Sequence, residues 1–299
     1  MILKSIVIPT RNRPILLNRV VAAIIPQLSN NDEIIIVDSS DSESMSENLG
    51  LLPQVKYIST HIRSAAVQRN IGLEQIADSK YVFFLDDDVL PGPDYFTRCV
   101  ESLNASNAIG LSGIAVNSSA KIYRTYPNGL IGFYHRIFQL DSNKDGVLLH
   151  SGVNIPVRDY QGKTHEVDWL IGCSIWSTEK IGATRFESDF LGQSLSEDVI
   201  FSIRMSKKGR LVTDSSIVLI HDESDIARPS KQEFWKMWMT NRYRLIQVAN
   251  FGMSGKISYW WANFGQCGIL CYSKIKGRGY KVGSLKGLMH GALLVLKGK

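Results

Sequence analysis

Cysteine is scarce in this sequence, and the positions of the cysteines argue against a domain stabilised by zinc or by disulfides. The four cysteines, Cys99, Cys173, Cys267 and Cys271, form no CxxC pair and no cluster with histidine, so a zinc site is not expected. Four scattered cysteines fit a reducing cytoplasm better than a disulfide framework. The first residues, MILKSIVIPT, lack the apolar stretch and the cleavage site of a signal peptide. We therefore expect a cytoplasmic protein.

Long apolar runs are also missing. A helix that crosses a bilayer needs about 20 predominantly apolar residues. The best candidate, Ile257 to Tyr272, has only 16 and includes Asn263 and Gln266. It does carry side chains that suit a membrane interface, namely Trp260, Trp261, Phe264, Ile269 and Leu270. The segment therefore predicts a helix that lies on a membrane surface without spanning it.

Acidic residues are almost absent from the end of the chain. Residues 231–299 contain 12 of the 34 Lys and Arg but only 1 of the 28 Asp and Glu. The rest of the chain holds the other 22 basic and 27 acidic residues. Such a basic tail can attract nucleic acid or anionic lipid, but it has none of the common nucleic-acid recognition signatures. We expect residues 230–299 to form a basic, aromatic helical region on an anionic membrane surface. Alternatively, the aromatics pack on the rest of the protein and the lysines are merely solvated.

The first half of the chain alternates apolar strands with amphipathic helices. Runs rich in Ile and Val, such as Ser5–Pro9 and Glu33–Val37, are typical of strands buried in a parallel sheet. Further strands are expected at Val55–Ile58, Tyr81–Leu85, Ile109–Val116 and Ile217–Ile220, and helices at Ile15–Ile25, Ser64–Ile76, Pro93–Leu103, Ser196–Lys207 and Lys231–Asn250. Residues 117–168 predict loops and short strands. This order indicates an α/β fold with a mainly parallel central sheet and flanking helices.

Three consecutive aspartates, Asp86, Asp87 and Asp88, follow an expected strand. Neighbouring carboxylates repel one another, which raises the cost of ionising all three. A hard cation such as Mg²⁺ or Mn²⁺ would relieve that cost and usually shares its shell with substrate phosphates. A solvated acidic turn is the alternative. Thr10 and Asp38 also end strands, and ligands of parallel sheets bind beyond such ends. The sequence therefore predicts a site for a phosphate-bearing substrate.

Six motifs, taken in order, resemble a family 2 glycosyltransferase of the GT-A fold. They are SIVIPTRNRP (5–14), EIIIVDSSD (33–41), AAVQRNIG (65–72), FFLDDDV (83–89), GCSIW (172–176) and SEDVIFSIRMSKKG (196–209). The resemblance implies a catalytic domain over residues 1–229, with a donor half at about 1–116 and an acceptor half at about 117–229. It also implies an inverting, metal-dependent transfer of sugar from a nucleotide-diphosphate sugar to an acceptor hydroxyl.

The resemblance assigns the donor-binding residues as Pro9, Thr10, Asp38, Arg69, Asp86 and Asp87. Asp38 resembles the aspartate that accepts a hydrogen bond from a uracil-like N–H, so a UDP- or dTDP-linked donor is expected. The alternatives are a helix N-cap for Thr10, an Asx-type turn for Asp38 and an exposed helical position for Arg69. The family often has Gly and Ala where Arg63 and Ser64 stand, which leaves open which arginine reaches the donor.

The same resemblance places Asp88 on a Mn²⁺ or Mg²⁺ ion, with His221 near the metal or the diphosphate. A strand-end or partly buried histidine is the alternative for His221. Asp198 corresponds to the base that takes the proton of the acceptor hydroxyl, with Glu197 and Trp176 on the acceptor side. Helix capping is the alternative for the two acids, since Ser194-Leu195-Ser196-Glu197 has the pattern of a capping box. A core position is the alternative for Trp176.

These interpretations predict an enzyme of bacterial surface polysaccharide assembly, with a lipid-linked or glycan acceptor, on the inner face of the cytoplasmic membrane. A nucleotidyltransferase could share the sheet and a metal-binding aspartate, but PTRNRP has no glycine where a phosphate loop would need one. A non-catalytic nucleotide-sugar-binding module is the second alternative, and Asp198 at its expected place argues against it. No nucleic-acid partner is expected.

Overall fold

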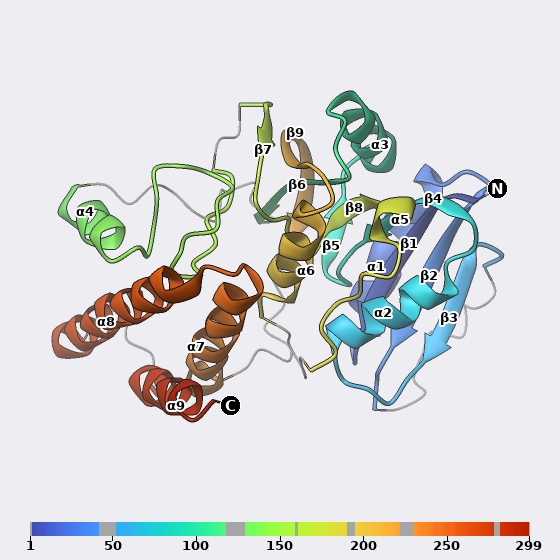
Figure 1. Ribbon diagram of the computed structural model, residues 1–299. Helices are drawn as coiled ribbons and strands as arrows, with labels where there is room; N and C mark the ends of the chain where they lie inside the picture. Colours follow the sequence, from blue (N-terminus) through green and yellow to red (C-terminus); the bar gives the residue numbers. More distant parts are fainter. Residues whose placement is uncertain are drawn as a thin grey trace. The chain divides into compact units, whose positions relative to one another are not determined.

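The computed structural model describes residues 2–41, 52–117, 129–158, 161–189, 195–221, 230–277 and 282–298. The chain forms two compact units, Met1–Arg124 with Asp159–Ser224 and Thr125–Arg158 with Asp225–Lys299. The first unit is mixed α/β and the second is mainly helical (Figure 1). Ser194 of the expected capping box and Arg278 and Lys281 of the basic tail lie outside the described residues.

In the described part of the first unit, nine strands form one sheet. They are β1 (Ile2–Thr10), β2 (Asp32–Asp38), β3 (Val55–Ser59), β4 (Ser79–Phe84), β5 (Val89–Pro91), β6 (Gly110–Asn117), β7 (Thr164–Glu166), β8 (Ser174–Ser177) and β9 (Leu211–His221). Their order is β3-β2-β1-β4-β8-β6-β9-β5, and β7 pairs with β9. The pairs among β1, β2, β3 and β4 are parallel, as is the long pair of β6 with β9. The remaining pairs are short and antiparallel. The predicted α/β fold with a mostly parallel central sheet and flanking helices is therefore confirmed.

The first helix shows why these elements pack as the sequence predicts. α1 (Pro14–Ile24) begins with a proline, whose fixed backbone angle suits a first helical turn. Its buried side chains, Leu17, Val20, Val21 and Ile24, recur at helical spacing and enter the same core as the apolar residues of β1 and β2. Pro26 lies in the 3-10 turn Ile25–Gln27, where the helix ends.

The other helices of the first unit are α2 (Ala65–Gln75), α3 (Tyr95–Ala105), α5 (Thr178–Ile181) and α6 (Glu197–Ser206). Ser64 caps α2 as predicted, because its hydroxyl accepts a hydrogen bond from the backbone N–H of Val67 at 3.3 Å. α3 begins later than expected, since Asp94 takes a left-handed conformation with φ of 56°. Pro93 therefore precedes the helix and does not lie in its first turn.

The second unit contains α4 (Gly129–Ile137), α7 (Lys231–Val248), α8 (Gly252–Lys276) and α9 (Ser284–Leu296). The prediction of loops and short strands in residues 117–168 is wrong for α4. Phe138, directly after α4, stacks on Trp261 of α8 with ring centroids 4.6 Å apart. Tyr134 donates its hydroxyl proton to the carbonyl of Gly265 at 2.9 Å. Packing on α8 thus stabilises a helix whose own periodicity is too short to predict it.

A buried arginine joins the parts of the second unit. Arg242 of α7 is 3% exposed and donates to the carbonyl of Ser151 at 2.6 Å and to Oδ1 of Asn263 at 2.9 Å. Its guanidinium lies 3.8 Å from the ring centroid of Trp238. Burial lowers the pKa of Arg242 to about 9, so it stays charged at neutral pH. The compact unit that contains the C-terminal helices also includes Thr125–Arg158. The sequence interpretation placed this segment in an acceptor half at about 117–229, and those domain bounds stay a prediction.

Within the described ranges, none of the helices combines the length and the apolar character that a membrane span requires.

The contact between α4 and α8 gives a prediction for stability. A Cβ on Gly265 would lie 2.3 Å from Cγ of Phe138, and the Phe138 ring cannot retreat because it is stacked on Trp261. Gly265→Ala should therefore lower the free energy of unfolding of the second unit by about 1–3 kcal/mol. The measurement is urea unfolding followed by tryptophan fluorescence. Ser273→Ala on the same helix is the control and should change stability by less than about 0.5 kcal/mol. Equal midpoints for Gly265→Ala and the native protein would contradict the packing described here.

Candidate active site

The carboxyl ends of three parallel strands bring polar residues to one edge of the sheet. Thr10 at the end of β1 pairs in register with Asp38 at the end of β2. On the other side of β1, β4 ends at Phe84, and Asp86, Asp87 and Asp88 follow shortly after it. Parallel pairing places all these strand ends at the same edge. The clustering that the sequence predicted for this edge is therefore present in the fold.

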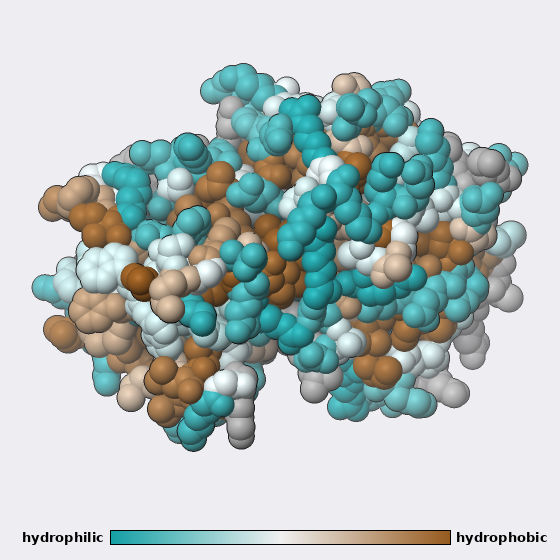
Figure 2. Space-filling model, viewed as in Figure 1, coloured by the Kyte–Doolittle hydropathy of each residue, from teal (hydrophilic) through white to brown (hydrophobic). Residues whose placement is uncertain are grey.

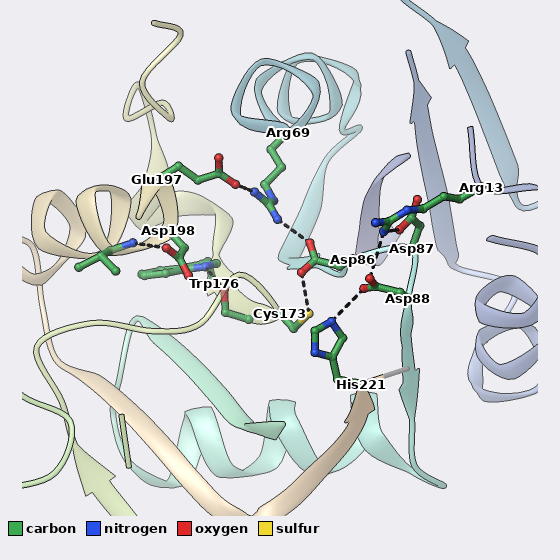
Figure 3. A network of polar contacts seen from close by, with 12 residues as sticks. Arg13, Arg69, Asp86, Asp87, Asp88, Cys173, Trp176, Glu197, Asp198 and His221 are labelled. Carbon is green, nitrogen blue, oxygen red and sulfur yellow. Dashed lines mark hydrogen bonds and ion pairs between the residues drawn. The ribbon is translucent and has the colours of Figure 1, made fainter. Parts of the chain in front are cut away.

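Thr10 and Arg13 hold the central aspartate of the run. The hydroxyl of Thr10 donates to Oδ2 of Asp87 at 2.7 Å, so Thr10 does not cap α1. Nη1 of Arg13 donates to Oδ1 of Asp87 at 2.8 Å and to Oδ2 of Asp88 at 3.0 Å (Figure 3). Burial raises the pKa of Asp87, and the contacts with Thr10 and Arg13 oppose that rise. One arginine thus partly neutralises two neighbouring carboxylates.

Asp88 faces His221 with its other oxygen. Oδ1 of Asp88 lies 3.2 Å from Nε2 of His221, at the end of β9. Burial alone would raise the pKa of Asp88, but His221 and Arg13 hold it below its ordinary value. His221 reaches this place because β5, which directly follows the aspartates, pairs Val89 with His221.

Asp88 and His221 present a carboxylate oxygen and an imidazole nitrogen, which are both atoms that bind divalent cations. At 3.2 Å these two atoms also stand at the distance of a hydrogen bond. The described residues contain no group of three or more His, Cys, Asp or Glu arranged to hold a metal. An ion here would therefore need oxygens from phosphate or water, which is usual for Mg²⁺ and similar ions.

Arg69 of α2 lies between two carboxylates. It forms ion pairs with Glu197, at the start of α6, and with Oδ1 of Asp86 at 2.6 Å (Figure 3). Arg69 is only 3% exposed, so it is not the exposed helical arginine of the alternative interpretation. Burial alone would lower the pKa of Arg69, but the charges of Glu197 and Asp86 raise it above its ordinary value. The guanidinium is consequently charged at any relevant pH.

Asp198 is the second residue of α6 and lies next to this ion-pair network. Its Oδ1 accepts a hydrogen bond from the backbone N–H of Val199 at 2.8 Å. Burial raises the pKa of Asp198 to about 6, while the Val199 N–H and the charge of Arg69 oppose the rise. Ser196 has a φ of 72° and makes no side-chain cap, and the side chain of Glu197 pairs with Arg69. Glu197 is therefore committed to Arg69, whereas Asp198 also satisfies a backbone N–H of the first helical turn.

Asp38 is buried, and its carboxylate accepts three hydrogen bonds. Ser40 donates its backbone N–H at 2.7 Å and its hydroxyl at 2.5 Å to Oδ1 of Asp38. Tyr57 of β3 donates its hydroxyl proton to Oδ2 at 2.6 Å. The contact with the backbone N–H of Ser40 is the Asx-type turn of the alternative interpretation. The two bonds from Ser40 fill Oδ1, whereas Oδ2 accepts only from Tyr57 and keeps a second lone-pair direction, so an Asx turn and a contact of Oδ2 with a nucleobase are compatible.

Residues 5–155 match the family model described as Glycosyl transferase family 2. This match covers half of the chain and includes the strand ends and the aspartate run. The chain belongs to glycosyl transferase family 2. No curated protein sequence gives a significant match.

Solved structures share the fold of this glycosyltransferase. S. aureus TarS 1-349 in complex with UDP-GlcNAc has a TM-score of 0.58 and 14% identity, over 97% of this chain and 79% of that one. GalNAc-T7 with UDP, GalNAc and Mn²⁺ has a TM-score of 0.58 and 14% identity, over 92% of this chain and 58% of that one. S. aureus TarS 1-349 in complex with UDP has a TM-score of 0.54 and 15% identity, over 92% of this chain and 74% of that one. At these identities the likeness shows the fold, which is GT-A.

One predicted site residue of the glycosyltransferase lies beside Asp198 in Figure 3 but is buried in the core. Trp176 of β8 is 1% exposed and packs edge-on against Phe201 with ring centroids 5.1 Å apart. Its indole N–H donates to the hydroxyl of Ser174 at 2.9 Å. With neither ring face open, Trp176 cannot stack on an acceptor sugar, and the core position is the correct one.

The sequence interpretation missed three residues that hold the site of this glycosyltransferase together. Arg13 pairs with two aspartates, and Tyr57 bonds Asp38. Gln68 donates to the carbonyls of Thr10 at 2.8 Å and of Val37 at 2.6 Å, tying α2 to the ends of β1 and β2. Arg13 and Gln68 stand inside two of the quoted motifs, and a polar residue in the buried stripe of α2 was the available signal for Gln68. Pro9 lies where predicted, paired with Val37 near the end of β1.

Proposed function

We propose that this glycosyltransferase transfers a sugar, with inversion, from a UDP- or dTDP-linked donor to a hydroxyl of a glycan or lipid-linked acceptor. The observation that carries the proposal is that Asp38 and the run Asp86–Asp88 follow parallel strands at one edge of the sheet. Arg69 links this run to the acids at the start of α6 (Figure 3). The first group suits a nucleoside diphosphate, and the second supplies a base. The relatives solved with UDP and UDP-GlcNAc support the donor class.

Asp198 is the proposed base of the reaction. As the acceptor oxygen bonds to the anomeric carbon, its proton passes to Asp198, while the bond from that carbon to the diphosphate breaks and the nucleoside diphosphate departs. A carboxylate with a pKa near 6 is ionised at neutral pH yet more basic than an ordinary aspartate. Glu197 stays on Arg69 and supports the start of α6.

The nucleobase is proposed to bind at Asp38, and the ribose near Asp86. Asp38 can accept an N–H from a pyrimidine in addition to its three internal donors. Asp86 directs one oxygen to Arg69 while 39% of its side chain stays exposed, which leaves room for a sugar hydroxyl. Thr10, Pro9 and Asp87 form the floor of this donor subsite.

A divalent cation, Mn²⁺ or Mg²⁺, is proposed to bind Asp88 and His221, whose facing atoms are 3.2 Å apart. The ion would stabilise the charge that develops on the departing diphosphate. The relative solved with UDP and Mn²⁺ supports this class of cofactor. Arg13, which contacts Asp88 through the other oxygen, keeps that carboxylate oriented toward His221.

The second unit is proposed to place the enzyme on an anionic membrane surface, as expected for a lipid-linked acceptor in surface polysaccharide assembly. In α8, exposed apolar residues recur at helical spacing: Met253, Ile257, Trp261, Phe264, Tyr272 and Ile275. α4 adds Leu130, Ile131, Phe133 and Ile137. Figure 2 shows apolar residues gathered where Figure 1 draws these two helices. Large exposed apolar patches usually mark interaction sites.

The charge of these helices supports a lipid surface as the partner. Neither α4 nor α8 contains an acidic residue. Arg136, Lys256, Lys274 and Lys276 on these helices are exposed, and each basic residue near an anionic surface contributes about 1 kcal/mol. A surface with apolar side chains and only positive charges matches an anionic bilayer interface.

Replacement of the proposed base is the first test. Asp198→Asn should lower the rate of UDP release from UDP-sugars by about 10²–10⁴-fold and leave UDP affinity nearly unchanged. In the native enzyme the base must be deprotonated, so kcat/KM should fall as the pH drops below about 6, the pKa of Asp198. Asp94→Asn, at the start of α3, is the matched control. Near-native turnover of a folded Asp198→Asn enzyme would refute the assignment, and nucleotidyl transfer or sugar binding without turnover would favour the alternatives.

The metal requirement is tested by chelation and titration. EDTA should stop transfer, and Mn²⁺ or Mg²⁺ should restore it. Asp88→Asn should raise the Mn²⁺ concentration for half-maximal activity at least about tenfold, because a neutral amide is a poorer ligand. Asp78→Asn, just before the opposite end of β4, should not. Full activity after exhaustive chelation would exclude the cofactor.

Membrane binding is tested by co-sedimentation with vesicles. The protein should bind vesicles that contain anionic lipid, and binding should weaken with added salt. Phe133→Asn combined with Phe264→Asn should weaken it about tenfold or more, since burying a large apolar side chain contributes about 1.5–3 kcal/mol. Val218→Asn, an exposed apolar residue of the first unit, is the control. Equal sedimentation of all three proteins would show that the apolar face does not contact lipid.

A further inference from the structure

Arg69 joins three separate elements of the first unit. It belongs to α2, and its guanidinium pairs with Asp86 after β4 and with Glu197 at the start of α6. The guanidinium also lies over the ring of Phe186, 5.5 Å from its centroid. Phe186 in turn stacks on Phe201 of α6 with ring centroids 4.1 Å apart. Both the charge and the packing of Arg69 therefore determine where α6 begins.

Gly172 leaves little free space next to the ion pair of Arg69 with Asp86. A Cβ on Gly172 would lie 3.2 Å from Nη2 of Arg69 and 3.6 Å from Oδ2 of Asp86, so the backbone at Gly172 comes close to this ion pair. The side chain of Arg69 is 4% exposed and that of Glu197 is 7% exposed, whereas that of Asp86 is 39% exposed. Of the two carboxylates that pair with Arg69, Asp86 is the more exposed, and its Oδ2 accepts a hydrogen bond from the thiol of Cys173 at 3.7 Å.

We propose that Arg69 is a positioning residue that fixes the donor-side carboxylate Asp86 and the base-bearing start of α6 at one separation, without touching the donor. This inference rests on the proposed function. It replaces the donor contact expected for Arg69, because both ends of the guanidinium are already occupied by buried or partly buried carboxylates. Two ion pairs on one planar group also fix direction, which a single contact does not.

Arg69 also sets the charge environment of the base. The groups that act on Asp198 are Arg69 from α2, Asp86 from the loop after β4, Glu197 on its own helix, and the N–H of Val199. Arg69 lowers the pKa of Asp198 and Asp86 raises it. Loss of the positive charge should therefore raise the pKa of Asp198 and move the acidic limb of the pH profile to higher pH.

The test compares Arg69→Met, which removes the charge, with Arg69→Lys, which keeps it but cannot bridge two carboxylates. The readouts are kcat and KM for UDP release from UDP-GlcNAc across pH 5–9, and UDP affinity by calorimetry. Both variants should lose about 100-fold in kcat, as a misplaced base does, with UDP affinity within about twofold. Only Arg69→Met should shift the acidic limb, upward by about one pH unit or more. Arg19→Met, on the exposed side of α1, is the control.

Some outcomes would overturn the proposal. A large loss of UDP affinity at native kcat would make Arg69 a donor-binding residue, and an unshifted limb in Arg69→Met would remove its electrostatic role. If Arg69→Met does not fold, the same measurements are made on Arg69→Lys and Glu197→Gln. Both variants should lower kcat without changing UDP affinity.

A carboxyl ¹³C NMR titration separates this inference from the proposed function. The signal of Asp198 is assigned by its absence in Asp198→Asn, and its pKa is then read without any turnover. If the native enzyme releases UDP from no donor, the proposed function fails. The pKa of Asp198 in Arg69→Met still decides whether Arg69 acts on it.

Discussion

Crowded negative charge is the constraint on which this active site depends. Five carboxylates, Asp86, Asp87, Asp88, Glu197 and Asp198, come together from one strand end and one helix start. Like charges at this separation would disfavour folding if they were unpaired. Four of them lie next to a basic side chain: Arg13 pairs with Asp87 and Asp88, His221 contacts Asp88, and Arg69 pairs with Asp86 and Glu197. Asp198 instead accepts the backbone N–H of Val199, and the charge of Arg69 favours its ionised form.

The two arginines solve the same problem in different ways. Arg13 is partly exposed and lies at the rim of the site, where a bound nucleotide could alter its partners. Arg69 is buried, so its contacts belong to the architecture, and desolvation makes their loss costly. Both arginines stand in short motifs near strand or helix ends. Their different degree of burial in the folded chain is what distinguishes the partly exposed Arg13 from the internal Arg69.

A fold shared with structures at about 14% identity depends on pattern more than on particular residues. Buried strands need Ile and Val in sequence, and a parallel sheet brings their carboxyl ends to one edge whatever the side chains are. The second unit shows the opposite case. Its packing depends on particular close approaches, such as the ring of Phe138 over Gly265 and the polar contacts of Arg242 with Ser151 and Asn263.

The sequence alone determined the strands, most of the helices and the edge of the sheet at which Thr10, Asp38 and the aspartates meet, because strand burial and helix periodicity are local patterns. Only the tertiary structure decided how the charges pair. Arg69 meets Glu197 across 128 residues and Phe138 meets Trp261 across more than 100, and no local pattern encodes such distant contacts. The same limit explains Trp176, since an aromatic near a predicted site is compatible with a sugar platform or a core position until its neighbours are known. Burial and pairing are properties of the folded chain, and they turn a set of candidate residues into a site.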